Sequence, residues 1–100
     1  MEAMKVTPKQ RRFLKAQSHH LKPLIQLGKE GPSAGFLRQL EEQINAHELI
    51  KVKVLGNCLA EKEEIEAAVG SVGVTVVQKI GHIYTFFRQR EENSNFDLDE

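Results

Sequence analysis

Residues 24–36 read LIQLGKEGPSAGF, and this stretch decides the fold. The apolar run at 24–27 predicts a short strand. Pro32-Ser33 predicts the start of a helix, because proline in the first helical turn gives up no hydrogen bond. Two glycines three residues apart, Gly28 and Gly31, separate the strand from the helix. A strand that turns directly into a helix indicates an α/β domain.

A first helix is predicted upstream, from Thr7-Pro8 to about residues 18–20, before Pro23. Threonine is a good N-cap, proline is tolerated next to it, and the residue before a proline disfavours helix. At ~100° per residue, apolar and amide side chains share one arc and cations the opposite one. The docking arc holds Gln10, Phe13, Leu14 and Gln17, and the cationic arc holds Lys9, Arg11, Arg12 and Lys15.

The helix that begins near Ser33 is amphipathic, and a strand follows it at residues 49–55. The expected buried stripe of the helix consists of Phe36, Leu37, Leu40, Ile44 and His47. Side chains alternate along a strand, so one face carries apolar residues and the other cations. The apolar face holds Ile50, Val52 and Val54, and the other face holds Lys51 and Lys53.

A third helix is predicted next, with Asn57 as a possible N-cap and glutamates in its first turns, which the helix dipole favours. Its expected buried stripe consists of Ile65, Ala68, Val69 and Val72. Residues 74–80 and 83–88 flank a turn at Gly81 and predict a hairpin of two strands.

The predicted order is therefore α-β-α-β-α-β-β. Strand–helix–strand units favour parallel pairing and the hairpin adds an antiparallel pair, so the sheet is mixed and four-stranded. The strands alternate apolar residues with Lys51, Lys53, Thr75 and Lys79. This alternation is typical of a two-layer α/β sandwich with one sheet face largely open to solvent. The pattern does not determine the spatial order of the strands.

The chain of 100 residues has room for one domain, at residues 1–90. An acidic tail at 91–100 is expected to be mobile, unless Phe96 and Leu98 dock on the domain. The apolar runs are too short to span a membrane, and the first residues lack the pattern of a signal peptide. We expect a cytoplasmic monomer.

The formal net charge is zero, but the charges are unevenly distributed. Residues 1–29 carry seven cations against Glu2 alone, and the last ten residues carry five acids and no cation. This asymmetry indicates a region that faces a polyanion, followed by an acidic tail. Charge alone leaves open the alternative that the cations only solvate a helix face. The seven cations are Lys5, Lys9, Arg11, Arg12, Lys15, Lys22 and Lys29.

The glycine pair lies where a backbone can approach phosphate closely. The first amides of a helix are unpaired and carry partial positive charge, so they favour an anion. Lys29 adds a cation to this site and Glu30 subtracts from it. The loop is similar in principle to the GXXG loop of KH domains. The glycines could instead serve only the turn, but no Walker or dinucleotide-binding pattern competes with this interpretation.

The surroundings of the loop favour RNA, since phosphate contacts supply most of the affinity for nucleic acid. The basic helix precedes the loop and the Lys51/Lys53 pair follows it. No row of exposed aromatic rings is expected, so the hypothesis is a grip on backbone and shape. The predicted RNA-binding residues are Lys9, Arg11, Arg12, Lys15, Lys22, Gly28, Lys29, Glu30, Gly31, Lys51 and Lys53.

Catalysis and metal binding have no positive support in the sequence. The four histidines lack the spacing of zinc ligands, and Cys58 has no base partner nearby in sequence. We expect no enzyme activity, no metal and no cofactor.

Three strings together resemble the CRM domain, named for chloroplast RNA splicing and ribosome maturation. They are TPKQRRFLKAQSHHLKPLIQLGKEG at 7–31, HELIKVKV at 47–54 and QKIGHIYTFFR at 78–88. The resemblance runs from about Thr7 to Arg90 and is strongest to stand-alone bacterial members of the YhbY type.

The resemblance implies a fold like the C-terminal domain of the third translation initiation factor. It also implies RNA binding through the GxxG loop, which falls on Gly28, Lys29, Glu30 and Gly31. Its implied partner is ribosomal RNA in large-subunit precursors. Pro32 departs from the family, which usually has an apolar residue such as leucine there. The alternatives are an intron or tRNA as the RNA, or a protein-interaction module that docks an acidic partner.

Overall fold

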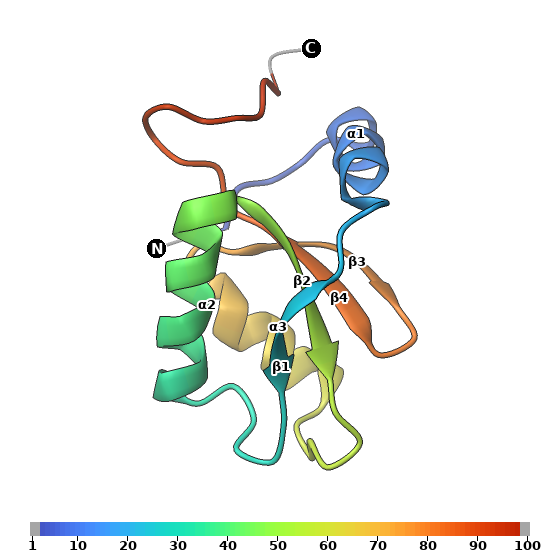
Figure 1. Ribbon diagram of the computed structural model, residues 1–100, viewed down its shortest axis with the longest axis vertical. Helices are drawn as coiled ribbons and strands as arrows, with labels where there is room; N and C mark the ends of the chain where they lie inside the picture. Colours follow the sequence, from blue (N-terminus) through green and yellow to red (C-terminus); the bar gives the residue numbers. More distant parts are fainter. Residues whose placement is uncertain (1–2, 99–100) are drawn as a thin grey trace.

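The computed structural model describes residues 3–98 and has the predicted α-β-α-β-α-β-β order (Figure 1). The elements are α1 (Pro8–Ser18), β1 (Pro23–Leu27), α2 (Ala34–His47), β2 (Leu49–Val54), α3 (Lys62–Gly70), β3 (Thr75–Ile80) and β4 (Ile83–Phe87). Glu2, Asp99 and Glu100, which contribute to the terminal charges, lie outside the described residues. Within residues 3–98, no helix has the length and apolar character needed to cross a membrane.

The four strands form one mixed sheet in the order β1-β2-β4-β3. The β1–β2 pair is parallel, with Ile25 opposite Val52, and β4 is antiparallel to both β2 and β3. The α/β class and the mixed sheet are thus confirmed. The order places β2 and β4 in the centre, where Val52, Tyr84 and Phe86 are fully buried.

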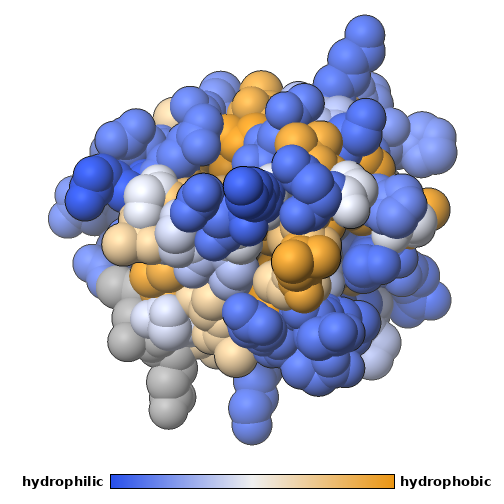
Figure 2. Space-filling view, turned by 90° about the horizontal axis from the view of Figure 1, so that it is seen from below, coloured by the Kyte–Doolittle hydropathy of each residue, from blue (hydrophilic) through white to orange (hydrophobic). Residues whose placement is uncertain are grey.

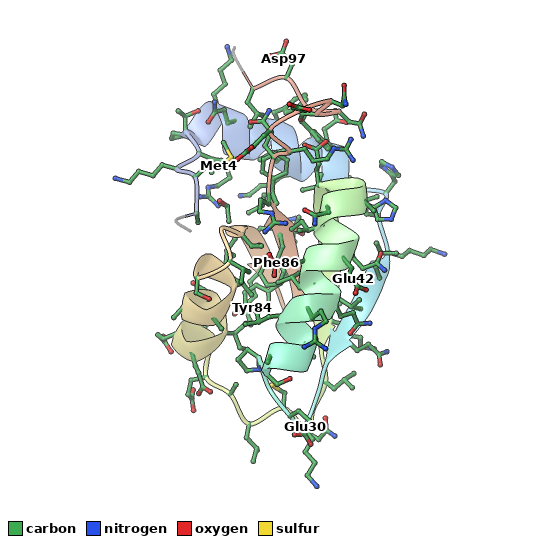
Figure 3. All side chains as sticks on the ribbon, turned by 90° about the vertical axis from the view of Figure 1, so that its left-hand side faces the viewer. Met4, Glu30, Glu42, Tyr84, Phe86 and Asp97 are labelled. Carbon is green, nitrogen blue, oxygen red and sulfur yellow. The ribbon has the colours of Figure 1, made fainter. Side chains whose placement is uncertain are left out.

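The main hydrophobic core lies between the sheet and the pair α2 and α3 (Figure 1). It is built from Ile25, Leu27, Phe36, Leu40, Ile44, Ile50, Val52, Ile65, Val69, Val74, Tyr84 and Phe86. Figure 3 shows Tyr84 and Phe86 between the two helices, and their rings are stacked 5.1 Å apart. Burial, together with the adjacent carboxylate of Glu66, raises the pKa of Tyr84 to about 12. This phenol therefore serves the core as a neutral group.

A second, smaller core lies on the opposite sheet face, because the strand residues that flank the main core point the other way. It consists of Leu14 from α1, Leu49, Val77 and Phe87 from the sheet, and Leu98 from the C-terminal segment. α1 therefore covers one end of the face that the sequence pattern predicted to be largely open. The rest of this face carries Lys53, Ile80 and Leu24, all exposed.

The helix starts follow local signals in two cases and not in the third. Thr7 accepts from the amide of Gln10 while the Gln10 side chain accepts from the Thr7 amide, which forms a capping box. Ser33 caps α2 by accepting from the amide of Phe36. The prediction of Asn57 as a cap is wrong, because α3 begins four residues later with Glu61 as N-cap and no side-chain cap bond.

Two helical faces differ from the predicted ones. In α1, Leu14 and Ser18 are buried while Phe13 is 40% exposed and Gln17 is exposed, so the docking arc is rotated. In α2, His47 is exposed because the helix ends there and leaves the sheet. The helix packs through Phe36, Leu40 and Ile44, with Leu37 at the margin.

Lys79 does not lie on the predicted sheet face, because β3 contains a bulge. The register shifts between Val76 and Gln78, so Lys79 pairs with Tyr84 on the face that α2 and α3 cover. It was expected beside Lys51 and Lys53, which lie on the opposite face. Its ammonium group lies 5.8 Å from the centroid of the Tyr84 ring.

The described part of the acidic tail docks on the domain through Phe96 and Leu98. The sequence leaves this docking open as the alternative to a mobile tail. Phe96 packs edge-on against Phe87 at 5.4 Å, and Leu98 is buried. The Leu98 carbonyl accepts from the Gln10 side chain at 2.8 Å. Mobility of the tail in solution stays a prediction.

Candidate nucleic-acid interface

The loop between β1 and α2 forms a tight turn at one end of the molecule (Figure 1). The amide of Gly31 donates to the carbonyl of Gly28 at 2.9 Å, and the amide of Ser33 donates to the carbonyl of Gly31 at 2.8 Å. Gly31 has a φ of +64°, a conformation that costs a side chain strain energy. The turn therefore requires glycine at this position for its backbone alone.

Gly28 differs from Gly31 in that its backbone lies against another loop. A Cβ atom there would meet the Leu55 side chain at 3.4 Å and that of Asn57 at 3.5 Å. Both belong to residues 55–61, which join β2 to α3 and which we call the β2–α3 loop. The second glycine of the pair thus shapes the turn, and the first lets the two loops pack closely.

The turn opens onto the unpaired amides at the start of α2. Ser33 caps Phe36, and the amides of Ala34 and Gly35 have no acceptor within the described part of the chain. Gly28, Lys29, Glu30 and Gly31 line a shallow hollow of about 360 Å³ together with Ser33 and Gly35. Backbone donors of this kind favour a phosphate group.

The electrostatics of this end are mixed. Lys29 and Glu30 are both exposed, and Figure 3 shows Glu30 at the extremity of the molecule. Glu61, Glu63 and Glu64 are exposed around the start of α3, beyond the β2–α3 loop. Seen from this end, Figure 2 shows a mainly hydrophilic surface interrupted by apolar side chains. Lys62, at the start of α3, is also exposed, but its ammonium group is paired with Glu66 at 2.9 Å. The carboxylates on that side therefore make the α2 side of the loop pair the more favourable one for an anion.

The cations of α1 lie far from the loop, at the opposite end of the molecule (Figure 1). Lys9, Arg12 and Lys15 are exposed, as predicted. Arg11 is not: its guanidinium is half-buried and donates to the carbonyls of Val76 at 2.8 Å and Val77 at 2.6 Å. Arg11 thus binds β3 at its bulge, where the register shifts between Val76 and Gln78. The prediction of an outward-facing Arg11 is wrong.

The remaining predicted lysines lie between these two ends. Lys22 is exposed just before β1. Lys53 is exposed opposite Gln26, two residues before Gly28, so the structure brings it close to the loop. Lys51 is half-buried opposite Thr85. Lys53 thus lies on the same sheet face as α1, and Lys22 precedes the strand that leads to the loop.

The side chains that could ligate a metal ion are dispersed in the described part of the chain. Within residues 3–98, no group of three or more His, Cys, Asp or Glu side chains is arranged to hold a metal ion. Cys58 is a free, half-buried thiol in the β2–α3 loop.

The comparisons with known proteins decide the family. The sequence profile of the CRS1/YhbY (CRM) domain matches residues 6–88, which is most of the chain. The chain belongs to the CRM domain family. The resemblance of the three sequence strings is thereby confirmed.

Two curated relatives match this CRM domain over most of their length, and a third is longer, with 66% of it matched. It is 39% identical to the Probable RNA-binding protein YqeI of Bacillus subtilis, over 93% of this chain and 98% of the relative. It is 43% identical to an RNA-binding protein of Haemophilus influenzae, over 87% and 89% of the two chains. A third relative, in Methanocaldococcus jannaschii, is also named as a probable RNA-binding protein and is 38% identical over 87% of this chain.

A solved structure has the same fold as this CRM domain. The solution structure of hypothetical protein SAV1595 from Staphylococcus aureus, described there as a candidate RNA-binding protein, matches with a TM-score of 0.71. The identity is 28%, over 94% of this chain and 99% of the other.

Sequence reasoning missed the β2–α3 loop as part of this end of the molecule. The amide of Leu55 donates to the carbonyl of Leu27 at 2.8 Å, which fixes this loop beside the glycine turn. Gly56-Asn57 marks a turn, but Leu59 stands between Cys58 and Ala60, and no local pattern marks it as exposed. Parallel pairing of β1 and β2 brings the two loops together.

Proposed function

We propose that this CRM domain binds structured RNA by its phosphate backbone, through the glycine turn at residues 28–31 and the exposed cations. The observation that carries the proposal is the open hollow at the start of α2. There Lys29 lies beside the unpaired amides of Ala34 and Gly35. The curated relatives named as RNA-binding proteins support RNA as the polyanion.

The interface grips backbone and shape, because the aromatic rings of the sheet are used in the cores. Tyr84, Phe86 and Phe87 are fully buried, so no stacking platform of aromatic side chains exists on the described sheet. Phosphate contacts through Lys29, Lys53, Lys22 and the exposed cations of α1 supply affinity with little sequence preference. Arg11, whose guanidinium is engaged with β3, is not part of this surface.

The separation of the two cationic regions favours a folded RNA over a short single strand. The molecule is 39 Å long in its longest dimension, and α1 and the glycine turn lie at opposite ends of it. An RNA that touches both must extend along the molecule, as a helical segment with an adjoining loop does. Double-stranded RNA is recognised in this way, by its shape and backbone.

The family resemblance directs the proposal to ribosomal RNA of large-subunit precursors in the cytoplasm, with the protein acting as a monomer and without catalysis of its own. An intron or tRNA would fit the same surface, and so would an acidic protein partner. Sedimentation of a cell lysate on a sucrose gradient separates these possibilities. RNase-sensitive co-migration with large-subunit precursors is expected, and a protein that stays at the top in low salt would contradict the ribosomal assignment.

The RNA-binding proposal is tested by charge reversal at both ends, Lys29→Glu with Arg12→Glu. Both side chains are exposed, so the domain should stay folded. Each lost phosphate contact should lower the slope of log affinity against log salt by roughly one, with at least about a tenfold loss of affinity. Lys79→Glu is the matched control, because Lys79 belongs to the opposite sheet face. An unchanged slope in the double variant would exclude this surface.

A further inference from the structure

The β2–α3 loop is fixed rigidly against the glycine turn. Besides the bond from Leu55 to Leu27, the amide of Cys58 donates to the carbonyl of Leu55 at 3.0 Å and closes a turn. The Cβ of Ala60 lies 3.7 Å from the position that a Cβ on Gly31 would occupy. Contacts at both glycines show that the two loops form one surface.

Leu59 projects from this surface into solvent. Its exposed fraction is 87%, the highest among the large apolar side chains of the described residues, against 66% for Ile80 and 51% for Leu24. Its neighbours Cys58 and Ala60 are packed against the main core. Since both neighbours are anchored, Leu59 is held outward by the fold, and no contact within the domain uses it.

The glycine turn and the β2–α3 loop carry different charges, so we expect them to contact different parts of a nucleotide. The α2 side offers Lys29 and unpaired amides, with Glu30 as the one opposing charge beside them. The β2–α3 side is bordered by the exposed carboxylates of Glu61, Glu63 and Glu64, which repel phosphate. The cation among them, Lys62, is paired with Glu66 at 2.9 Å. A nucleotide with its phosphate over α2 therefore turns its base towards Leu59. Leucine is a side chain that proteins use as an apolar wedge against nucleic-acid bases.

We propose that Leu59 contacts the face of an unpaired base in the RNA whose phosphate is held at Gly28–Gly31. This inference rests on the proposed function and adds a preference for an unpaired nucleotide at the loop end. The domain would then recognise the junction of a helix with a loop or bulge, with the helix directed towards α1.

The test compares two RNA probes in fluorescence anisotropy, a hairpin with an unpaired loop and a fully paired duplex of the same length. Leu59→Ala should weaken hairpin binding about fivefold, the scale of one apolar base contact, and leave the salt slope unchanged. Duplex binding should stay within about twofold, because no unpaired base is present. Leu59→Phe should bind the hairpin at least as tightly as wild type does, since an aromatic ring stacks on a base better than leucine. Ile80→Ala removes an exposed apolar side chain elsewhere and should change neither probe.

The outcomes distinguish this inference from the proposed function. If Lys29→Glu weakens hairpin binding and Leu59→Ala does not, the inference is overturned while RNA binding stands. If the wild-type protein binds neither probe at low salt, both fail. If Leu59→Ala alters only self-association in analytical ultracentrifugation, Leu59 serves a protein contact and the inference is overturned. Thermal unfolding of Leu59→Ala should match wild type, because the side chain is 87% exposed.

Discussion

The two ends of α2 differ in whether their polar groups are hydrogen-bonded within the protein. Gly31, before the helix, has a φ of +64°, and Glu48, directly after it, has a φ of +66°. At the first end the amides of α2 stay open to solvent beside Lys29. At the second end a completely buried carboxylate is surrounded by donors. The first amides of α2 are thus left for solvent or a ligand, whereas the polar groups after its last residue are hydrogen-bonded within the protein.

Glu48 connects α2 to the C-terminal segment. Its carboxylate accepts from the amide of Arg90 at 2.8 Å, the hydroxyl of Ser94 at 2.7 Å and the amide of Asn95 at 2.6 Å. The guanidinium of Arg90 donates to the last carbonyls of α2, those of Asn45 and Ala46, where the helix dipole favours a cation. Among buried side-chain atoms of residues 3–98, only Nε of Arg90 lacks a partner. This end is closed, and it fixes the tail.

Glu48→Gln would break the closed end and should have the largest effect on stability. The amide can replace only part of the acceptor capacity, so buried donors on the tail lose their partners. The expected loss is about 2–3 kcal/mol in the free energy of unfolding, measured in urea. Glu42→Gln, at an exposed position of α2, is the control and should be neutral within about 0.5 kcal/mol. An equal effect of the two substitutions would show that the buried carboxylate contributes nothing special.

Gly31→Ala would break the open end by its backbone. A Cβ in the left-handed region costs about 1–2 kcal/mol, although its nearest neighbour, Ala60, leaves room for it at 3.7 Å. RNA affinity should fall with stability, because the turn that exposes the amides is altered. Gly56→Ala is the control, since nothing lies within 4 Å of its added Cβ. Unfolding and binding measured on both variants decide whether the turn or the packing requires glycine.

Acid should weaken the closed end of α2. Burial alone would raise the pKa of Glu48, but hydrogen bonds from Asn95, Ser94 and Arg90 and the charge of Arg90 outweigh it, so the pKa lies below its ordinary value near 4.5. A lowered folded-state pKa gives stability that is fully present above the ordinary value and is lost as pH falls through the folded one. Wild type should therefore lose stability below about pH 4.5, and Glu48→Gln should lose less over the same range. Parallel pH profiles of the two proteins would contradict this assignment.

The features predicted from sequence are those that depend on local signals. Thr7, the glycine turn and the alternation of Lys51 and Lys53 each act within a few residues, and the structure has the cap, the turn and the strand where they were expected. Arg11 and Lys79 were predicted wrongly because no local pattern marks the bulge in β3. The bulge turns Lys79 to the other sheet face, and Arg11 donates to a carbonyl at the bulge. The roles of Leu59 and Glu48 could not be predicted, because they depend on the strand order and on the docking of the tail, which are long-range properties.

The most direct test of the open end is a titration of the ¹⁵N-labelled protein with a hairpin RNA, followed by amide chemical shifts. The account predicts the largest shifts at the amides of the glycine turn and the first residues of α2, with further shifts in the β2–α3 loop and little change around Glu48 and Asn95. Shifts confined to α1, with none at residues 28–36, would contradict the claim that the open end of α2 holds the RNA.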